Sequence, residues 1–253
     1  GNGAGTVQVF NEGNTVVVQE ADGASVEFRI SGAGSGQVTA RASGWDLKLT
    51  DTTAESMLTI VASGGDGRVT MHDVHGQGPL GIFSAPNSDL AGTLAIEGSL
   101  HSLTLGTVQG GTVSATAIQG FMVMGNLTNG TLLIGGNLGA DGRAGGIGVN
   151  ADAFGAGAVG TLFVRGDMTG TTVRIGQDPT DGIYDNGNDV AQGGIAYLHV
   201  QGALGADTHV HPHTVMTGAA AGDDCEIGPF SRLRPGTVLA GHVKVGNFVE
   251  MKY

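Results

Sequence analysis

Oxygen-bearing side chains gather in one Gly-rich stretch of the sequence. Asp178, Asp181, Asp185 and Asp189 lie close together there, and a second such stretch holds Asp141, Asn150 and Asp152. Calcium takes about six to eight oxygen ligands, so these loops are compatible with a calcium site. The spacing is not that of an EF-hand, and Asp and Asn also favour Gly-rich turns for backbone reasons alone. Calcium binding and plain turn chemistry both fit.

Three histidines alternate in a second stretch of the sequence. His209, His211 and His213 would lie on one face of a strand, where three imidazoles can hold zinc, nickel or copper. Pro212 interrupts the alternation, so exposed histidines at a junction are the other interpretation.

A six-residue period in the sequence predicts the strands and turns that position the histidines. One aliphatic or small residue recurs at every sixth position, namely Val215, Ala221, Ile227, Leu233, Leu239, Val245 and Met251. This period fits one short strand and one turn per face of a β-solenoid. We therefore predict coils of three faces with these residues pointing inward.

The sequence motifs of this segment resemble those of a known family. The resemblance rests on Cys225-Glu-Ile-Gly-Pro-Phe-Ser-Arg-Leu-Arg-Pro-Gly236 and Val245-Gly-Asn-Phe-Val-Glu-Met-Lys252, with Leu204-Gly-Ala-Asp-Thr-His-Val-His-Pro-His213 as a weaker preceding coil. These residues resemble the left-handed β-helix of the bifunctional N-acetylglucosamine-1-phosphate uridyltransferase and glucosamine-1-phosphate acetyltransferase. Residues 204–253 are therefore expected to form a left-handed hexapeptide-repeat β-helix.

The resemblance also implies a ligand site. It places Arg234 and Lys252 on the sugar phosphate and Glu250 at a further active-site position, and two cations suit a phosphate. The family's catalytic histidine and acetyl-CoA groove come from later coils, and the sequence stops at Tyr253. We therefore expect no catalytic residue and no cofactor in this segment. Cys225 is expected to be a buried, inert thiol.

The rest of the chain reads as short strands. Gly accounts for 48 of 253 residues and aromatic residues for 5%, which indicates many strands joined by tight turns. Residues 6–83 contain eight apolar runs about ten residues apart: 7–10, 16–18, 26–30, 38–40, 45–49, 58–61, 69–71 and 80–83. Further on, one half-coil pattern recurs at 94–100, 121–127, 162–168 and 198–204. Inserted loops at about 137–157 and 178–194 follow the middle copies, and such insertions project from one face of a solenoid.

Charge and hydropathy exclude some classes of partner. The formal net charge is −12 with only 11 Lys and Arg, which argues against nucleic acid. No apolar run approaches the ~18 residues of a membrane span, and the first residues do not resemble a secretion signal.

We predict an all-β, elongated parallel β-helix, right-handed over residues 1–203 and ending in a short left-handed column over 204–253. A change of hand within one column would be unusual, because one coil templates the next. A natural fused module, an engineered cap and an incomplete piece of a longer chain all fit this sequence.

The leading functional interpretation is a non-catalytic structural protein of a bacterial surface or extracellular fibre. Repetitive coils and open solenoid ends point to self-association as an end-to-end polymer or a homotrimer. The alternatives are a degenerate or truncated sugar-phosphate N-acetyltransferase-like module, which would place the protein in the cytoplasm, and a β-helix that binds or processes polysaccharide. Carbohydrate is therefore a further candidate partner.

Overall fold

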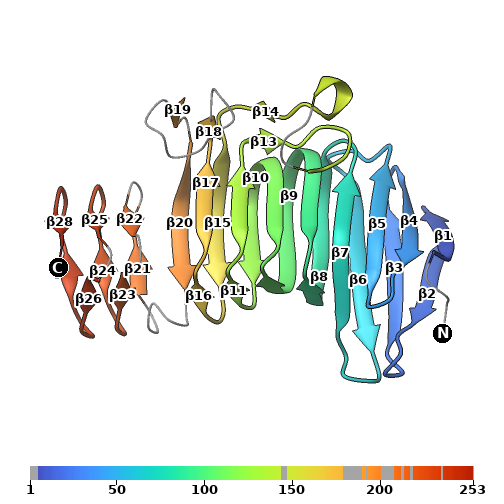
Figure 1. The fold of residues 1–253 in the computed structure, drawn as a ribbon, viewed down its shortest axis with the longest axis horizontal. Helices are drawn as coiled ribbons and strands as arrows, with labels where there is room; N and C mark the ends of the chain where they lie inside the picture. Colours follow the sequence, from blue (N-terminus) through green and yellow to red (C-terminus); the bar gives the residue numbers. More distant parts are fainter. Residues whose placement is uncertain are drawn as a thin grey trace.

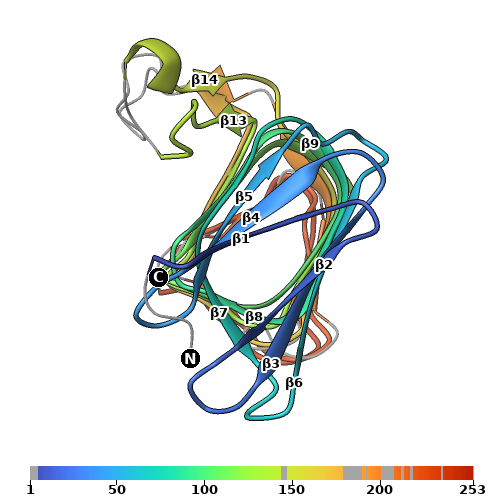
Figure 2. The ribbon, with the colours of Figure 1, turned by 90° about the vertical axis from the view of Figure 1, so that its right-hand side faces the viewer.

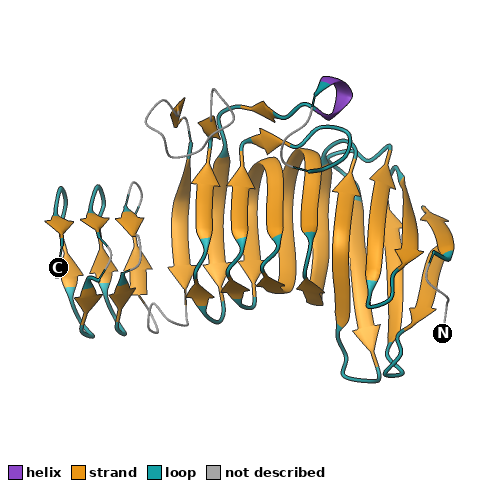
Figure 3. Ribbon diagram, viewed as in Figure 1, coloured by secondary structure: helices purple, strands orange, loops and turns teal. Residues whose placement is uncertain are grey.

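The computed structural model shows an all-β protein drawn out along one axis (Figure 1). The structure describes residues 5–143, 147–178, 190–191, 193–200, 208–211, 214–216, 219–234 and 236–252. Within these ranges the one helical segment is a single 3₁₀ turn, η1 (Gly148–Asn150), and strands make up the column (Figure 3). The described residues contain no helix long and apolar enough to cross a bilayer. The prediction of an all-β solenoid is confirmed.

The first strands form antiparallel hairpins that close one end of the column. They are β1 (Val7–Asn11), β2 (Thr15–Gln19), β3 (Ser25–Ser31), β4 (Ser35–Ala40), β5 (Trp45–Thr50) and β6 (Met57–Ser63). β1, β4 and β5 make one antiparallel sheet, and β2, β3 and β6 make the other. All six strands were predicted, but their pairing differs from the coils expected here. The short connections at 20–24 and 41–44 can only turn the chain back, whereas parallel neighbours need a longer crossover.

Aromatic side chains fill this antiparallel end. The rings of Phe10 and Phe28 are both fully buried, with centroids 6.3 Å apart. A Cβ atom on Gly36 would lie 2.1 Å from the Phe10 ring, so Gly36 provides the space for that ring. Trp45 donates from Nε1 to Glu20 Oε1 at 2.8 Å, and burial raises the pKa of Glu20.

The main body consists of parallel coils. Its strands are β7 (Val69–Gly76), β8 (Leu80–Leu90), β9 (Thr93–Gln109), β10 (Thr112–Met124), β11 (Leu127–Thr128), β12 (Thr131–Ile134), β15 (Ala158–Val164), β16 (Met168–Thr169), β17 (Thr172–Ile175) and β20 (Gly194–Val200). β9 and β10 are long because they turn a corner and contribute to more than one face. Viewed along the axis, successive coils overlie one another around one cross-section (Figure 2).

The coil length corrects one repeat assignment. Leu94, Val113 and Leu132 are register partners at intervals of 19 residues. Met122, Leu162 and Leu198 stack on another face, so the copies beginning at 121, 162 and 198 do lie together. The copy at 94–100 lies on a different face from these three. Its distance in sequence from the copy at 121 does not equal one 19-residue coil, and Leu94 pairs with Val113 instead.

Both inserted loops rise on the same side of the column (Figure 1). The first contains β13 (Gly136–Asn137) and β14 (Ala153–Phe154), paired antiparallel. It packs Leu138 and Phe154 on the outer face, against Ala95 and Leu133. The second contains β18 (Gln177–Asp178) and β19 (Val190–Ala191), also antiparallel.

An antiparallel pair joins the body to the hexapeptide column. β21 (Thr208–Val210) pairs antiparallel with β20, and Leu198 is the register partner of Val210. Leu198 packs against the buried clusters of both columns, so the interior lies on the same side of both strands. The chain keeps advancing along the axis (Figure 1) while its strand direction reverses. A change of hand after β20 stays a prediction, as does which hand belongs to which column.

The hexapeptide column has three faces. Its further strands are β22 (Val215–Met216), β23 (Ala220–Ala221), β24 (Glu226–Ile227), β25 (Arg232–Leu233), β26 (Val238–Leu239), β27 (Lys244–Val245) and β28 (Glu250–Met251). The faces are β21–β24–β27, β22–β25–β28 and β23–β26, all parallel. A positive φ occurs every sixth residue at the turns, at Asp224, Phe230, Gly236, His242 and Phe248.

The inward residues follow the predicted period with one exception. Ala221, Ile227, Leu233, Leu239 and Val245 are buried. Val215, however, is 50% exposed, and Met216 packs against the core in its place. Val210 and Ile227 are register partners only 17 residues apart, whereas Ile227 and Val245 are 18 apart. The first coil is one residue shorter, so the period shifts by one position.

Candidate functional site

Charged residues in β25 and β28, and directly after each strand, form the candidate ligand site on the hexapeptide column. Leu233 points into the core, so its neighbours Arg232 and Arg234 point outward. Arg234 donates from Nε to Glu250 Oε1 at 2.6 Å, and Arg232 is the register partner of Glu250. The hydrogen bond and charge of Arg234, with the charges of Arg232 and Lys252, hold the pKa of Glu250 below its usual range.

The structure thus brings together Arg234, Glu250 and Lys252, the three residues that the family resemblance singled out. Three cations surround one carboxylate, which leaves this patch net positive on an acidic chain. All four side chains are exposed. Such a patch can bind an anion, although Arg234 must share its guanidinium with Glu250.

The histidine stretch lies at the junction of the two columns. His211 Nε2 lies 3.0 Å from Glu226 Oε1, and Lys244 Nζ lies 2.5 Å from Glu226 Oε2. Lys244 first and His211 second hold the pKa of Glu226 below its usual range. His209 is in β21, where only its backbone is described, and His213 lies outside the described residues. A transition-metal site at these histidines stays a prediction.

The acidic loop is described only at its base. Asp178 pairs with Val190 through its backbone, while Asp181, Asp185 and Asp189 lie outside the described residues. In the first loop, Asp141 Oδ1 accepts a hydrogen bond from the Arg143 backbone N–H at 3.1 Å, which is turn chemistry. The described residues contain no group of three His, Cys, Asp or Glu placed to hold a metal ion. Calcium in the second loop stays a prediction.

One charged network was not visible in the sequence. Arg41 donates to Asp46 at 2.6 Å and to Asp73 at 2.8 Å, and Arg143 of the first inserted loop reaches Asp73 at 3.2 Å. Asp73 Oδ1 also accepts a hydrogen bond from the Thr93 backbone N–H. These residues are up to 102 positions apart and meet only because strands β5, β7 and β9 are neighbours. The network ties the loop and successive strands together.

The predicted burial of Cys225 is confirmed. Its side chain is 1% exposed, and Sγ donates to the backbone oxygen of Ala240 at 3.1 Å.

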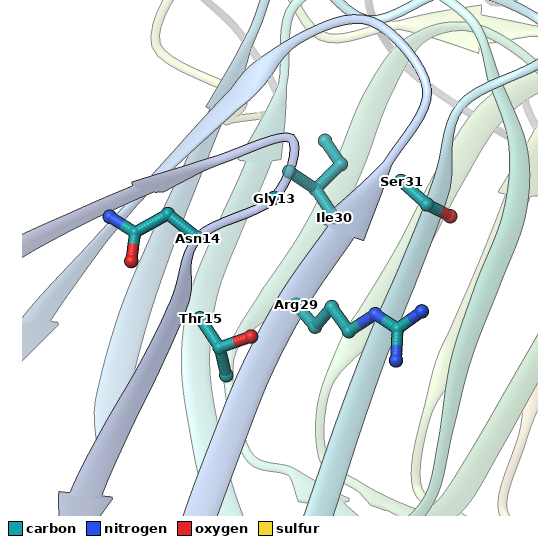
Figure 4. A pocket seen from close by; sticks show the side chains of 6 residues that line it. All are labelled: Gly13, Asn14, Thr15, Arg29, Ile30 and Ser31. Atoms are coloured by element: carbon teal, nitrogen blue, oxygen red, sulfur yellow. The ribbon is translucent and has the colours of Figure 1, made fainter.

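A shallow hollow of about 280 Å³ lies at the N-terminal end (Figure 4). It is lined by residues of the β1–β2 turn and of β3, namely Gly13, Asn14, Thr15, Arg29, Ile30 and Ser31. Arg29 is the only ionisable group among these lining residues, so the hollow offers one charge and hydrogen bonds but no acid–base pair.

Fold and repeats together define the class of protein: a β-solenoid whose C-terminal column is a hexapeptide-repeat β-helix. Several curated relatives match part of the chain, and they are bifunctional GlmU proteins. The protein from Alkalilimnicola ehrlichii is 64% identical over 50 residues, which are 20% of this chain and 11% of the relative. The Xanthomonas euvesicatoria protein is 50% identical over 66 residues, and the Acinetobacter baumannii strain AYE protein is 38% identical over 94 residues.

These matches confirm the resemblance of the hexapeptide segment to that family. They cover 26% and 35% of this chain for the latter two relatives, and 14% and 20% of the relatives themselves. The chain thus spans a fifth or less of the length of these curated relatives. No protein-family model matches the chain. No solved structure matches it either.

Proposed function

We propose that the chain is a non-catalytic structural β-solenoid that associates with further copies of itself, in a fibre or layer at a bacterial surface. The joining surface lies at the N-terminal edge, in β1 and β2. The observation that carries this proposal is that both edge strands are uncharged and apolar on their outer side.

Within the described residues, β1 pairs only with β4 and β2 only with β3. Their free edges therefore offer backbone N–H and C=O groups to another strand. Val9 is 59% and Val17 is 52% exposed, and neither strand contains a charged residue or a proline. Proteins commonly protect edge strands with charges, prolines or bulges, and these two strands have none of those.

A second copy suits β2 because the strand is nearly self-complementary. Its sequence is Thr-Val-Val-Val-Gln with Val17 at the centre. In an antiparallel pair of two copies, Val17 faces Val17 of the other copy and Val16 faces Val18. Such a two-fold contact uses the same patch on both partners and joins two copies, so a fibre or layer needs a second contact elsewhere on the chain.

The arrangement of charge supports a structural role for the column. Arg41, Arg68 and Arg234 each form ion pairs with carboxylates of neighbouring strands or coils. These pairs lie on the outer surface and connect one strand to the next.

A matched pair of variants tests the edge. Val17→Lys places a charge on the edge strand β2, whereas Val61→Lys places one on β6, an inner strand that pairs with β3 along its length and with β8 at residues 57–59. Both positions are register partners of Glu27 and are similarly exposed, at 52% and 48%. In analytical ultracentrifugation at micromolar concentration we expect the wild type and Val61→Lys to associate and Val17→Lys to sediment as a monomer. A monomeric wild type, or equal association of both variants, would contradict the proposal.

A second candidate function is recognition of a sugar phosphate, and the net positive patch around Glu250 favours it. In this reading the column is an acetyltransferase-like module, and the protein would act in the cytoplasm. We expect Lys252→Ala to weaken binding of glucosamine-1-phosphate and Glu250→Gln to strengthen it, because the latter frees Arg234. Isothermal titration checks both, and identical affinities in all three proteins would remove this candidate. Acetyl transfer from acetyl-CoA is expected to be absent.

A further inference from the structure

One outer face of the body combines aromatic side chains with hydroxyl groups. It is formed by β8, β9, β10, β15 and β20, which follow one another along the column (Figure 1). Met122, Leu162 and other alternate residues of these strands are buried in the core. The residues between them therefore point outward.

Two parallel rows of outward residues run along the axis. Phe121, Thr161 and Tyr197 are register partners in the first row, and Val123 and Phe163 are register partners in the second. Phe121 is 60% exposed and Tyr197 is 40% exposed. Because adjacent strands lie about 4.8 Å apart, these two rings are about 10 Å apart along the axis. Phe163 lies on the strand between them, two residues beyond Thr161.

Hydroxyl groups continue the second row toward β8, where Thr104 and Ser84 precede Val123. Beside them on β9 and β8 lie Ser102 and Ile82, which are register partners of each other.

The second row continues from Phe163 to His199 of β20, where only the backbone is described. Among the described side chains of these two rows, none belongs to Asp, Glu, Lys or Arg. This is notable on a chain with a formal net charge of −12.

We propose that this face binds a neutral polysaccharide laid along the axis of the column. Exposed rings can stack on the apolar C–H faces of sugar rings, and flanking hydroxyls exchange hydrogen bonds with sugar hydroxyls. The separation of Phe121 and Tyr197 is about the length of a disaccharide, so both rings can contact one extended chain. The lack of Lys and Arg among the described side chains of these rows disfavours an acidic polymer.

The interleaving distinguishes this face from a contact between two copies. A stable protein interface has a contiguous apolar core with a polar rim. Here Thr161 separates Phe121 from Tyr197, so hydroxyl and ring alternate in the first row, while Val123 and Phe163 are neighbours in the second.

Affinity gel electrophoresis of the folded chain tests the proposal. The probes are hydroxyethylcellulose, pullulan and dextran, with polygalacturonate as the acidic comparison. We expect at least one neutral polymer to retard the wild type and polygalacturonate to have no effect. Phe121→Ala is expected to lower the affinity by about three- to tenfold.

Phe248→Ala is the matched control, because Phe248 is 81% exposed and belongs to the other column. It should leave retardation unchanged. Three outcomes would each overturn the proposal: no retardation by any neutral polymer, an equal loss in both variants, or a wild-type oligomer that Phe121→Ala dissociates. The last would show that a second copy covers the face.

Discussion

Replacing Ile227 by Ala should unfold the hexapeptide column and leave the body folded. Ile227 is fully buried in the cluster of that column, which is separate from the cluster of the body. Among the described residues, Leu198 packs against both clusters. Removing a buried Ile side chain to Ala costs about 2–5 kcal/mol. A unit of ~50 residues carries about 2.5–7.5 kcal/mol of stability, so most of it would be lost.

The single Trp allows the two columns to be followed separately. Trp45 lies in β5 and is 4% exposed, so its fluorescence reports the body. Circular dichroism follows strands of both columns. For Ile227→Ala we expect the Trp45 melting transition to stay in place while part of the dichroism signal is lost at lower temperature.

Leu162→Ala is the matched core variant in the body, since Leu162 is also fully buried. It should lower the Trp45 transition. If Ile227→Ala shifts the Trp45 transition as far as Leu162→Ala does, the two clusters unfold as one unit and the reasoning fails.

Three further predictions concern the N-terminal end, the first loop and the pH response. Gly36→Ala should destabilise the antiparallel end by about 1–3 kcal/mol, measured by urea denaturation, because the new methyl group would overlap the Phe10 ring. Asp73→Asn should speed limited proteolysis at residues 139–143, because Arg143 loses its ion pair. Glu226 stabilises the hexapeptide column above its unfolded pKa of about 4.5, and this contribution is lost as the pH falls through the lowered folded pKa. Melting of Glu226→Gln should therefore depend less on pH in that range.

Each of these three predictions has a control variant or a result that would contradict it. Gly246→Ala should be tolerated, because nothing lies within 4 Å of a Cβ atom there. An unchanged cleavage rate in Asp73→Asn would mean that Leu138 and Phe154 alone hold the loop. If wild type and Glu226→Gln lose stability in parallel below pH 4.5, the pairs with Lys244 and His211 contribute nothing.

Local patterns in the sequence predicted the strands better than their partners. The run 26–30 falls within β3, because alternation of apolar residues is a property of neighbouring positions. That β3 pairs antiparallel with both β2 and β6 depends on how the chain crosses between sheets, which no short window contains. The predicted coils at this end therefore turned out to be hairpins.

Small changes of spacing had large effects on the predicted interior. A single missing residue in the first hexapeptide coil moved the inward position from Val215 to Met216. In the candidate site, Arg234 and Glu250 could be assigned from their motif. Their direct contact could not, because the register of β25 on β28 decides it.

The reversal of strand direction between β20 and β21 has a consequence for how β-solenoids can be built. Parallel stacking forces each new coil to copy the length and winding of the one below it. An antiparallel contact imposes neither, because it needs only a few matching backbone groups at one face. At this junction a coil of 36 residues, from Leu162 to Leu198, therefore meets one of 17 residues, from Val210 to Ile227, across three residue pairs. The hairpin works as an adaptor, so unrelated repeat types can be joined in series by exchanging one column at this position.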